Sequence, residues 1–524
     1  MEPPLSPQWK FSWVRRVVTL VLLLMILAIA TTVRLAQLGS LRYWFDEAFT
    51  IRMSEFPVPE MIVRCAADTH PPLFFFVLKG WIASWGHSEF SARLLSTVWS
   101  LLGVGVAFGF TYEALRAGRD RSSHPAIVLL AATTAGLCVA LSPLQISWAQ
   151  QVRMYAAVTG LSLAGTWLLW RAIQNPASWK RWTAYGLVEV AGLYTHVTML
   201  FVFAAHLLAL GAILIRGRNN WADTKPLARP ALLTIAMVGM IALPWIVVER
   251  IQHSRVQEDF WSKPLTLDLL GTAFVKCVTL SQRPVTSPII GLGIAQGLFL
   301  VLLVVAAGRR PFDLLVSLSA GVPIALLIGA SIANTNLVNE RYFIAGHALL
   351  CVAIPVWIAR LPSWSLRIPL AATVVASQAY FTWDYHLWRS QMAGRPGIPE
   401  LLATWQEHRE ADEPLVFCNP MFSTVARMYQ DPADLRIFGQ EDDYPFFVGT
   451  AITSDEEYLS SAEIDSGRWQ KIWVCDHGNR ERYLNPVEMS DAWRLVTEKG
   501  VSDYSGAYYL RSYERSEQRK ISDH

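Results

Sequence analysis

Hydrophobic positions along the chain gather in long uninterrupted runs, separated by short polar segments. A helix rises 1.5 Å per residue, so roughly 20 apolar residues cross a bilayer core ~30 Å thick. The pattern predicts a polytopic α-helical membrane protein with about eleven transmembrane helices. These runs lie at residues 17–38, 90–115, 126–141, 154–170, 182–194, 199–215, 230–248, 288–308, 312–332, 343–358 and 366–383.

Basic side chains follow every second run. The clusters lie at residues 15–16, 116–121, 180–181, 216–229, 309–310 and 360–367. Because short cytoplasmic loops collect Lys and Arg, the N-terminus is predicted inside and the chain after the last run outside. No small-residue cleavage site follows the first run, so we interpret it as a retained span rather than a removed signal peptide.

The pattern changes near residue 387, where charged residues and prolines become frequent and no later run could span a bilayer. Short apolar segments at 414–418, 435–438 and 471–475 and the alternating segment 505–513 predict strands, and 422–429 predicts a helix. We therefore expect a transmembrane domain over residues 1–386 and a small extracytoplasmic α/β domain over residues 387–524. No nucleotide-binding glycine pattern occurs in the second domain.

Composition supports the membrane assignment. The chain has 524 residues, of which 53% are hydrophobic and 17% charged, too apolar for an ordinary soluble protein of this size. Its six cysteines have neither metal-ligand spacing nor the density of a disulfide framework. Cys418 and Cys475 could pair only if their domain lies in an oxidising compartment.

The first outer loop, residues 39–90, carries two polar clusters at its two membrane borders. Asp46 and Glu47 follow three aromatic residues, and Asp68 and His70 precede the next apolar stretch. Partial desolvation makes a carboxylate a stronger base, able to deprotonate an acceptor hydroxyl or to hold a metal. The candidate metal ligands are Asp46, Asp68 and His70. The ordinary alternative for Asp46 and Glu47 is that they are solvated acids in a loop. For Asp68 and His70 it is that they belong to a turn that starts a helix.

Two arginines on the same predicted face, Arg153 and Arg341, are each followed closely by a tyrosine, Tyr155 and Tyr342. A guanidinium offers a planar fork of donors that fits phosphate oxygens, whereas snorkelling at the interface is the ordinary role of such an arginine. His196 lies in a tight outer turn, where it could serve either as a helix cap or as a ligand.

One acid, Glu189, lies deep within a predicted span. Ionisable groups at such depth are expensive to bury, so they serve as interhelical partners or mark functional sites. The sequence leaves both roles open for Glu189.

Short motifs occur in a fixed order on the predicted outer face. Their set resembles the membrane glycosyltransferases of the GT-C fold, particularly the protein-mannosyltransferase-like group that includes the Rgt-type and aminoarabinose lipid A transferases. The resemblance covers about residues 10–385. The motifs are Phe45-Asp46-Glu47-Ala48, Asp68-Thr69-His70-Pro71-Pro72-Leu73, Glu89-Phe90-Ser91-Ala92-Arg93-Leu94, Ser142-Pro143, Gln151-Val152-Arg153-Met154-Tyr155, Tyr194-Thr195-His196 and Glu340-Arg341-Tyr342.

The resemblance implies a polyprenyl- or dolichyl-phosphate sugar as donor, inversion at the anomeric carbon and a catalytic acid in the first outer loop. Asp46 matches that acid and Glu47 the acid beside it, while Arg153 and Arg341 match positions where a basic residue would meet the donor phosphate. The expected substrate-binding residues are Asp68, His70, Arg93, Arg153, Tyr155, His196, Arg341 and Tyr342. Metal dependence stays open, and no nucleotide cofactor is expected.

We therefore expect an integral membrane glycosyltransferase of the bacterial cytoplasmic (inner) membrane, working on the cell envelope. It would move a sugar from a polyprenyl phosphate to an extracytoplasmic glycan, lipid or protein, with no nucleic-acid partner. One alternative is a transporter, which should show intramembrane charges and two related halves. Another is a membrane-anchored binding or sensor protein, which would not need polar clusters in four outer loops.

Overall fold

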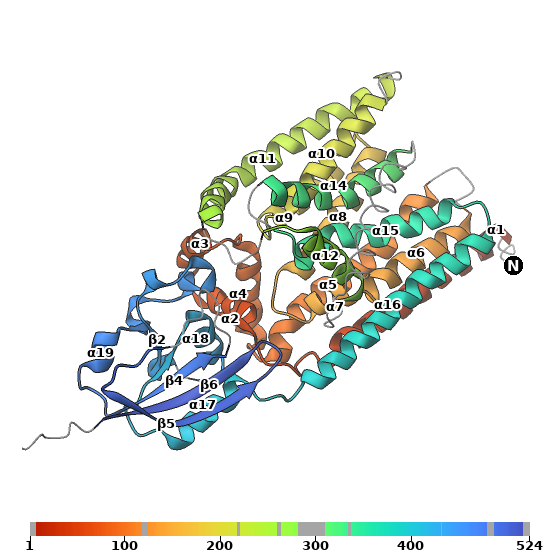
Figure 1. Ribbon diagram of the computed structural model, residues 1–524. Coiled ribbons are helices and arrows are strands. Elements are labelled where there is room, and N and C mark those ends of the chain that lie inside the picture. Colours follow the sequence, from red (N-terminus) through yellow and green to blue (C-terminus); the bar gives the residue numbers. More distant parts are fainter. Residues whose placement is uncertain are drawn as a thin grey trace, which may run out of the picture.

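The computed structural model describes residues 7–117, 124–216, 221–258, 264–280, 310–333, 337–430, 432–478 and 487–516. A long helical bundle makes up most of the molecule, and an α/β part sits at one end of it (Figure 1). The predicted eighth run, at residues 288–308, lies outside the described residues.

The bundle is built from helices that run up and down. Among its tightest pairs, α5 packs against both α6 and α8, and α14 packs against α10 and α15. Small residues allow the close approach, since a Cβ added at Gly103 of α5 would lie 3.2 Å from Thr159 of α8. The bundle helices are α1 (Pro7–Leu35), α5 (Glu89–Arg116), α6 (Pro125–Ala140), α7 (Pro143–Ala149), α8 (Tyr155–Gln174), α9 (Trp179–Leu193), α10 (Met199–Arg216), α11 (Trp221–Glu258), α12 (Leu267–Thr279), α14 (Pro311–Ala333), α15 (Ile344–Arg360) and α16 (Trp364–Met392).

Within the described residues, seven helices are long and apolar enough to cross a membrane, or eight if α6 and α7, which meet at 52°, form one span. The helical membrane architecture is thus confirmed, while the number eleven is not. Two predicted spans form helices that fail this test: α9 has only 15 residues, and α16 has 29 residues but is too polar.

The first outer loop folds into three further helices, α2 (Phe45–Glu55), α3 (Val58–Ala67) and α4 (Leu73–Trp85). Prolines and a glycine mark the breaks between them: Pro57 precedes α3, Pro72 precedes α4, and Gly86 ends α4 with a positive φ of 73°. The loop is therefore a compact helical layer at the end of the bundle.

The C-terminal part holds a six-stranded sheet in the order β3-β2-β1-β4-β6-β5. Strands β3, β2, β1 and β4 are parallel, and β6 and β5 are added antiparallel. Its elements are α17 (Ile398–His408), β1 (Leu415–Phe417), α18 (Pro420–Ala426), β2 (Leu435–Phe438), β3 (Tyr458–Leu459), α19 (Ser461–Asp465), β4 (Lys471–His477), β5 (Trp493–Ser502) and β6 (Ala507–Arg515), with short 3-10 turns between β2 and β3.

This sheet confirms the predicted α/β class, and the four predicted strands all occur. Strand β5 was not predicted because most of its residues are exposed and its sequence lacks an apolar alternation. Cys418 and Cys475 are both buried as free thiols.

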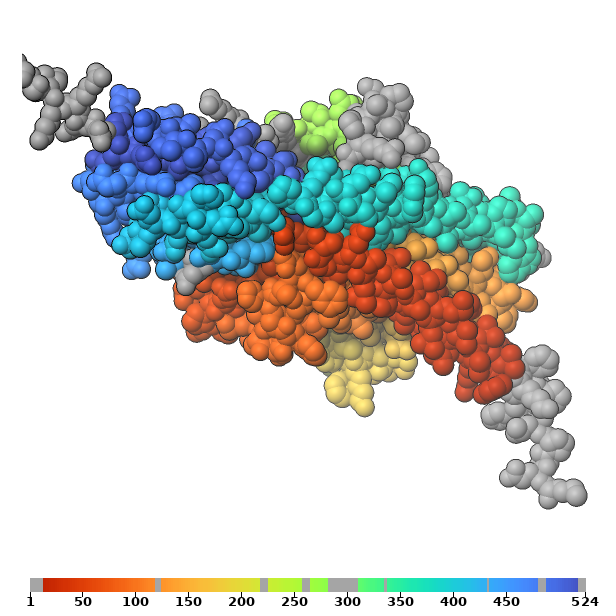
Figure 2. Space-filling view, turned by 90° about the horizontal axis from the view of Figure 1, so that it is seen from below, coloured from red at the N-terminus to blue at the C-terminus, as the bar shows by residue number. Residues whose placement is uncertain are grey.

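The two parts are joined by extensive contacts. Helix α16 runs beyond the expected boundary at 386 and lies along α1 on one face of the molecule (Figure 2). On the opposite side of the joint, α18 packs against α2, and Ala48 of α2 is fully buried in the apolar core of the sheet domain. The hydroxyl of Tyr429 donates to Glu89 at 3.0 Å, which links this domain to the start of α5.

Candidate functional site

Asp46 and Glu47 occupy the first turn of α2, where the positive end of the helix dipole favours carboxylates. Successive residues of an α-helix point about 100° apart, so the two acids cannot face the same way. The structure shows this divergence, because Glu47 turns into the core and Asp46 lines a cavity.

Glu47 forms a buried ion pair with Arg93 of α5. Two hydrogen bonds of 2.8 Å join the guanidinium to the carboxylate, and the side chains are 1% and 2% exposed. The backbone N–H of Val152 also donates to Glu47. Arg93 donates further to the carbonyls of Leu38 and Leu41. Neither member of the pair lines the cavity, so the pair fixes α2 onto α5 from behind the site.

Asp46 faces two arginines. Nη1 of Arg341 donates to Oδ2 of Asp46 at 3.1 Å, and Nη2 of Arg153 lies 3.9 Å from the same oxygen. Each guanidinium also lies over the ring of its nearby tyrosine, Arg341 at 5.0 Å from the ring centre of Tyr342 and Arg153 at 5.9 Å from that of Tyr155. Segments from three different parts of the chain thus meet at one carboxylate.

Arg153 is held in place by α2 and by His70. Its Nη1 donates to the hydroxyl of Thr50 at 2.9 Å, and its Nη2 lies 2.9 Å from Nε2 of His70. The side chain is only 3% exposed, yet its Nε has no hydrogen-bond partner among the described residues. A buried donor without an acceptor is costly, so this guanidinium is suited to an anionic ligand.

The contacts of His70 define its tautomer. Arginine can only donate, so Nε2 of His70 must accept from Arg153, and Nδ1–H then donates to Asp68 at 2.7 Å. Burial alone would raise the pKa of Asp68, but the hydrogen bond from His70, together with the charge of Arg153, outweighs burial and lowers that pKa. Asp68 therefore serves as the counter-charge that orients His70 and Arg153.

His196, in the turn between α9 and α10, lies between these groups. Burial, and then the positive charges of Arg153 and Arg341, hold the pKa of His196 well below its usual value. The backbone N–H of Thr198 donates to Nδ1 of this neutral ring, so its proton is on Nε2. His196 can thus offer an N–H to a ligand oxygen.

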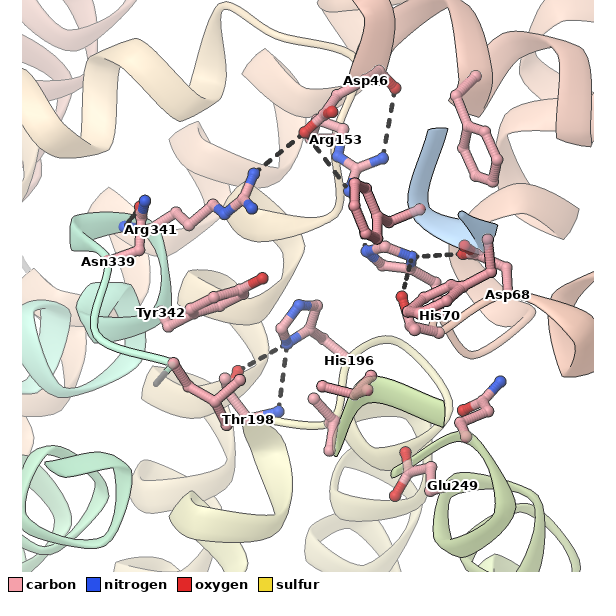
Figure 3. A pocket seen from close by; sticks show the side chains of 18 of the residues that line it. Asp46, Asp68, His70, Arg153, His196, Thr198, Glu249, Asn339, Arg341 and Tyr342 are labelled. Carbon is pink, nitrogen blue, oxygen red and sulfur yellow. Dashed lines mark hydrogen bonds and ion pairs between the residues drawn. The ribbon is translucent and has the colours of Figure 1, made fainter. Parts of the chain in front are cut away.

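These side chains surround one cavity of about 500 Å³ (Figure 3). Of the residues expected to bind substrate or act in catalysis, Asp46, Asp68, His70, Arg153, His196, Arg341 and Tyr342 all line it. Tyr155 does not line the cavity but packs behind it, with its ring centre 5.2 Å from that of His196. Glu47 and Arg93, which pair with each other in the core, do not line the cavity.

The cavity also contains residues that the sequence did not single out. Glu249 and His253 of α11 line it, and Figure 3 shows Glu249 on the side away from Asp46 and Arg341. Met421, Phe446 and Phe447 line it from the sheet domain. The position of Glu249, an acid directly after the apolar run of α11, could have indicated a site residue from the sequence alone. Nothing in the local sequence marks the three apolar residues as part of a site.

The expected metal candidates do not assemble into a metal site in the described part of the chain. No group of three or more His, Cys, Asp or Glu side chains there could hold a metal ion. Asp68 and His70 instead bind each other, and the Oδ2 of Asp46 faces guanidinium groups. Arg153 and Arg341 thus place two positive charges beside the Oδ2 of Asp46.

Glu189 lies outside this site, in the interior of the bundle. Its carboxylate is 3.1 Å from Nδ1 of His206 on α10, and both side chains are fully buried. The hydroxyls of Thr166 and Tyr185 lie within hydrogen-bond distance of the same histidine. Glu189 is therefore an interhelical partner.

Solved structures with the same architecture are membrane glycosyltransferases. ArnT from Cupriavidus metallidurans bound to undecaprenyl phosphate aligns over 93% of this chain and 97% of its own, with a TM-score of 0.58 and 13% identity. The archaeal oligosaccharyltransferase AglB from Archaeoglobus fulgidus, in complex with an inhibitory peptide and a dolichol-phosphate, aligns over 88% of this chain and 70% of its own, with a TM-score of 0.51 and 11% identity.

At the level of sequence, no family model and no curated protein matches the chain. The structural likeness nevertheless extends over both the bundle and the C-terminal part. The fold is therefore that of the GT-C membrane glycosyltransferases, as the order of the motifs predicted.

Proposed function

We propose that this protein is an integral membrane glycosyltransferase that moves a sugar from a polyprenyl-phosphate donor to an acceptor hydroxyl outside the cytoplasm. The observation that carries the proposal is the meeting of Asp46 with Arg153 and Arg341 in one cavity at the ends of the spanning helices. A base beside two phosphate-binding groups is what transfer from a lipid phosphate requires.

Donor binding is the task of the two arginines and His196. Within the described part of the chain, the Nε donor of Arg153 has no acceptor, and its side chain is too buried to be satisfied by bulk water. The Nε2–H of His196 adds a neutral donor, as inferred from its contact with Thr198. Together they would bind the phosphate oxygens and stabilise the charge that develops as the lipid phosphate departs.

Asp46 is the proposed general base. The acceptor hydroxyl gives its proton to the Asp46 carboxylate while its oxygen forms a bond to the anomeric carbon. The bond between that carbon and the phosphate oxygen breaks, and the lipid phosphate leaves with the electron pair. Attack on the face opposite to the leaving group inverts the anomeric configuration. Both described contacts of this carboxylate use Oδ2, so we assign the proton transfer to Oδ1.

The structural neighbours support this choice of donor, since one holds undecaprenyl phosphate and another a dolichol-phosphate. Basic residues at alternate helix ends support an orientation with the sheet domain outside the cytoplasm, and we propose the bacterial inner membrane as the location. Arg171 pairs with Glu113 and Arg360 with Asp313 at helix ends remote from Asp46, in line with this orientation.

The test is an assay of purified protein with an undecaprenyl-phosphate sugar. Release of undecaprenyl phosphate together with a glycosylated acceptor supports the proposal, and transport of the intact lipid without release contradicts it. Glu113→Gln is a matched control for substitutions at Asp46, because it removes a charge at the other end of the bundle.

A further inference from the structure

The sheet domain supplies one wall of the catalytic cavity. Met421, at the start of α18, and Phe446 and Phe447, in a 3-10 turn after β2, all line the cavity that contains Asp46. Phe446 and Phe447 are called the aromatic wall below. It is apolar and half-buried, in contrast to the charged groups across the cavity.

The wall is held firmly on both sides. Val448 and Ile452, which follow the two phenylalanines, are at most 2% exposed, and Ile452 belongs to the apolar core of the bundle. Arg64 of α3 donates to the carbonyls of Ala451 and Thr453 at 2.8 and 3.2 Å. The turn is therefore a fixed surface that is anchored in both domains.

A close contact joins the wall to the catalytic helix. Gly449 has a φ of +99°, which favours glycine, and a Cβ added there would lie 3.0 Å from the ring of Phe45. Phe45 immediately precedes Asp46 in α2. Phe45, Asp46 and both phenylalanines of the wall line the same cavity.

The geometry points to the acceptor subsite: we propose that the aromatic wall binds a sugar ring of a glycan acceptor and brings its hydroxyl to Asp46. This inference rests on the proposed function. The rings of Phe446 and Phe447 stand at 85° with centres 5.6 Å apart, and both residues line the cavity. An aromatic face has negative charge density that attracts the polarised C–H groups on one side of a sugar ring.

The position of the wall favours a glycan over an acyl lipid. The wall belongs to a sheet domain in which no described helix is long enough to span a membrane. An acceptor held by acyl chains would be expected to approach between the spanning helices, whereas an acceptor bound on the sheet domain would be expected to approach from the aqueous side. A glycan combines hydroxyl groups with apolar ring faces, and these match the polar and aromatic sides of the cavity.

The test uses full-length protein in detergent with an undecaprenyl-phosphate sugar and a panel of defined oligosaccharides, an acyl lipid disaccharide and a serine peptide as acceptors. We expect the parent to glycosylate oligosaccharides. Phe446→Ala and Phe447→Ala should each raise the acceptor KM about 10-fold, as loss of a stacking contact of this kind does. The donor Kd should stay within about twofold of the parent value.

Two further variants make the result specific. Phe446→Leu keeps apolar volume but removes the ring face, so it should leave the KM as high as in Phe446→Ala. Leu495→Ala removes an exposed apolar side chain of the same domain on β5 and should leave the acceptor KM unchanged. Unchanged donor binding also shows that the variants are folded.

Several outcomes would overturn the inference: recovery of the parental KM by Phe446→Leu, an unchanged KM in both Ala variants, or a parent that glycosylates only the peptide or the acyl lipid. Each of these leaves the proposed function intact. A parent that neither binds undecaprenyl-phosphate sugar nor releases the lipid phosphate would instead refute the proposed function itself.

Discussion

Asp46 and Glu47 are neighbours in sequence, yet their carboxylates point in different directions from α2 and bind different arginines. Glu47 is paired with Arg93 in the core, while Asp46 meets Arg341 at the cavity. The first pair is almost fully buried, whereas the Asp46 side chain is 18% exposed. Glu47 is thus bound in the core, and Asp46 faces the cavity.

Glu47→Gln is predicted to damage stability more than donor binding. Removing one partner of a buried ion pair leaves Arg93 charged and uncompensated, at a cost of ~3–5 kcal/mol. Thermal unfolding in detergent measures the effect. Glu113→Gln, in a pair that is 37–43% exposed, should cost less than about 1 kcal/mol. Equal melting temperatures for the two variants would show that the Glu47–Arg93 pair does not stabilise the fold.

Arg153→Ala and Arg341→Ala are predicted to weaken donor binding by about 10- to 100-fold each, from the loss of charge-assisted hydrogen bonds worth ~1.5–3 kcal/mol. Lys at either position should recover only part of the lost donor affinity, because it keeps the charge but lacks the planar set of donors of a guanidinium. Titration with an undecaprenyl-phosphate sugar measures the Kd. Parental affinity in both Ala variants would mean that these arginines do not contact the phosphate.

His196 is predicted to make the stability of the protein depend on pH. Its pKa is lower in the folded state than in the unfolded chain, so the unfolded chain takes up the proton first as the pH falls. Stability should therefore be complete above a pH of about 6.5 and decline below it. Melting temperatures of the parent and of His196→Gln between neutral and mildly acid pH test this.

The variant should lose less stability than the parent over that range. His124→Gln, at an exposed position before α6, should behave like the parent. Parallel curves for the parent and His196→Gln would contradict a neutral, buried His196.

The sequence predicted most of the bundle because an apolar run long enough to span a bilayer leaves few alternatives to a helix. It also placed Asp46, Arg153 and Arg341 on one face, since alternate loops share a side of the membrane. The sequence could not show the contact itself, because Asp46 and Arg341 are 295 positions apart. Their pairing depends on how the fold brings the turn before α15, which carries Arg341, to the start of α2.

Other parts of the site depend on tertiary packing that no local pattern encodes. Phe446 and Phe447 resemble ordinary core residues of the sheet domain, and they reach the cavity only because α18 and the turn after β2 pack onto α2 and α3. Helix geometry alone predicts that Asp46 and Glu47 point in different directions. Which of the two is buried depends on the position of Arg93, and the sequence does not show that position.

Topology is predicted to place the sheet domain and the cavity on the same, extracytoplasmic side. Reporter fusions after Gly394, just beyond the end of α16, test this directly. A reporter that functions only outside the cytoplasm should be active there, whereas activity of a cytoplasm-specific reporter would contradict both the orientation and the proposed donor side.

The most direct test of the proposed function compares Asp46→Asn with the parent in turnover and in donor binding. Asn keeps the size of the side chain but lacks a basic carboxylate, so turnover of the undecaprenyl-phosphate sugar should fall by ~10²–10⁴-fold while the donor Kd changes little. Glu113→Gln should retain the parental rate. An Asp46→Asn variant that transfers sugar at the parental rate would contradict the assignment of Asp46 as the general base.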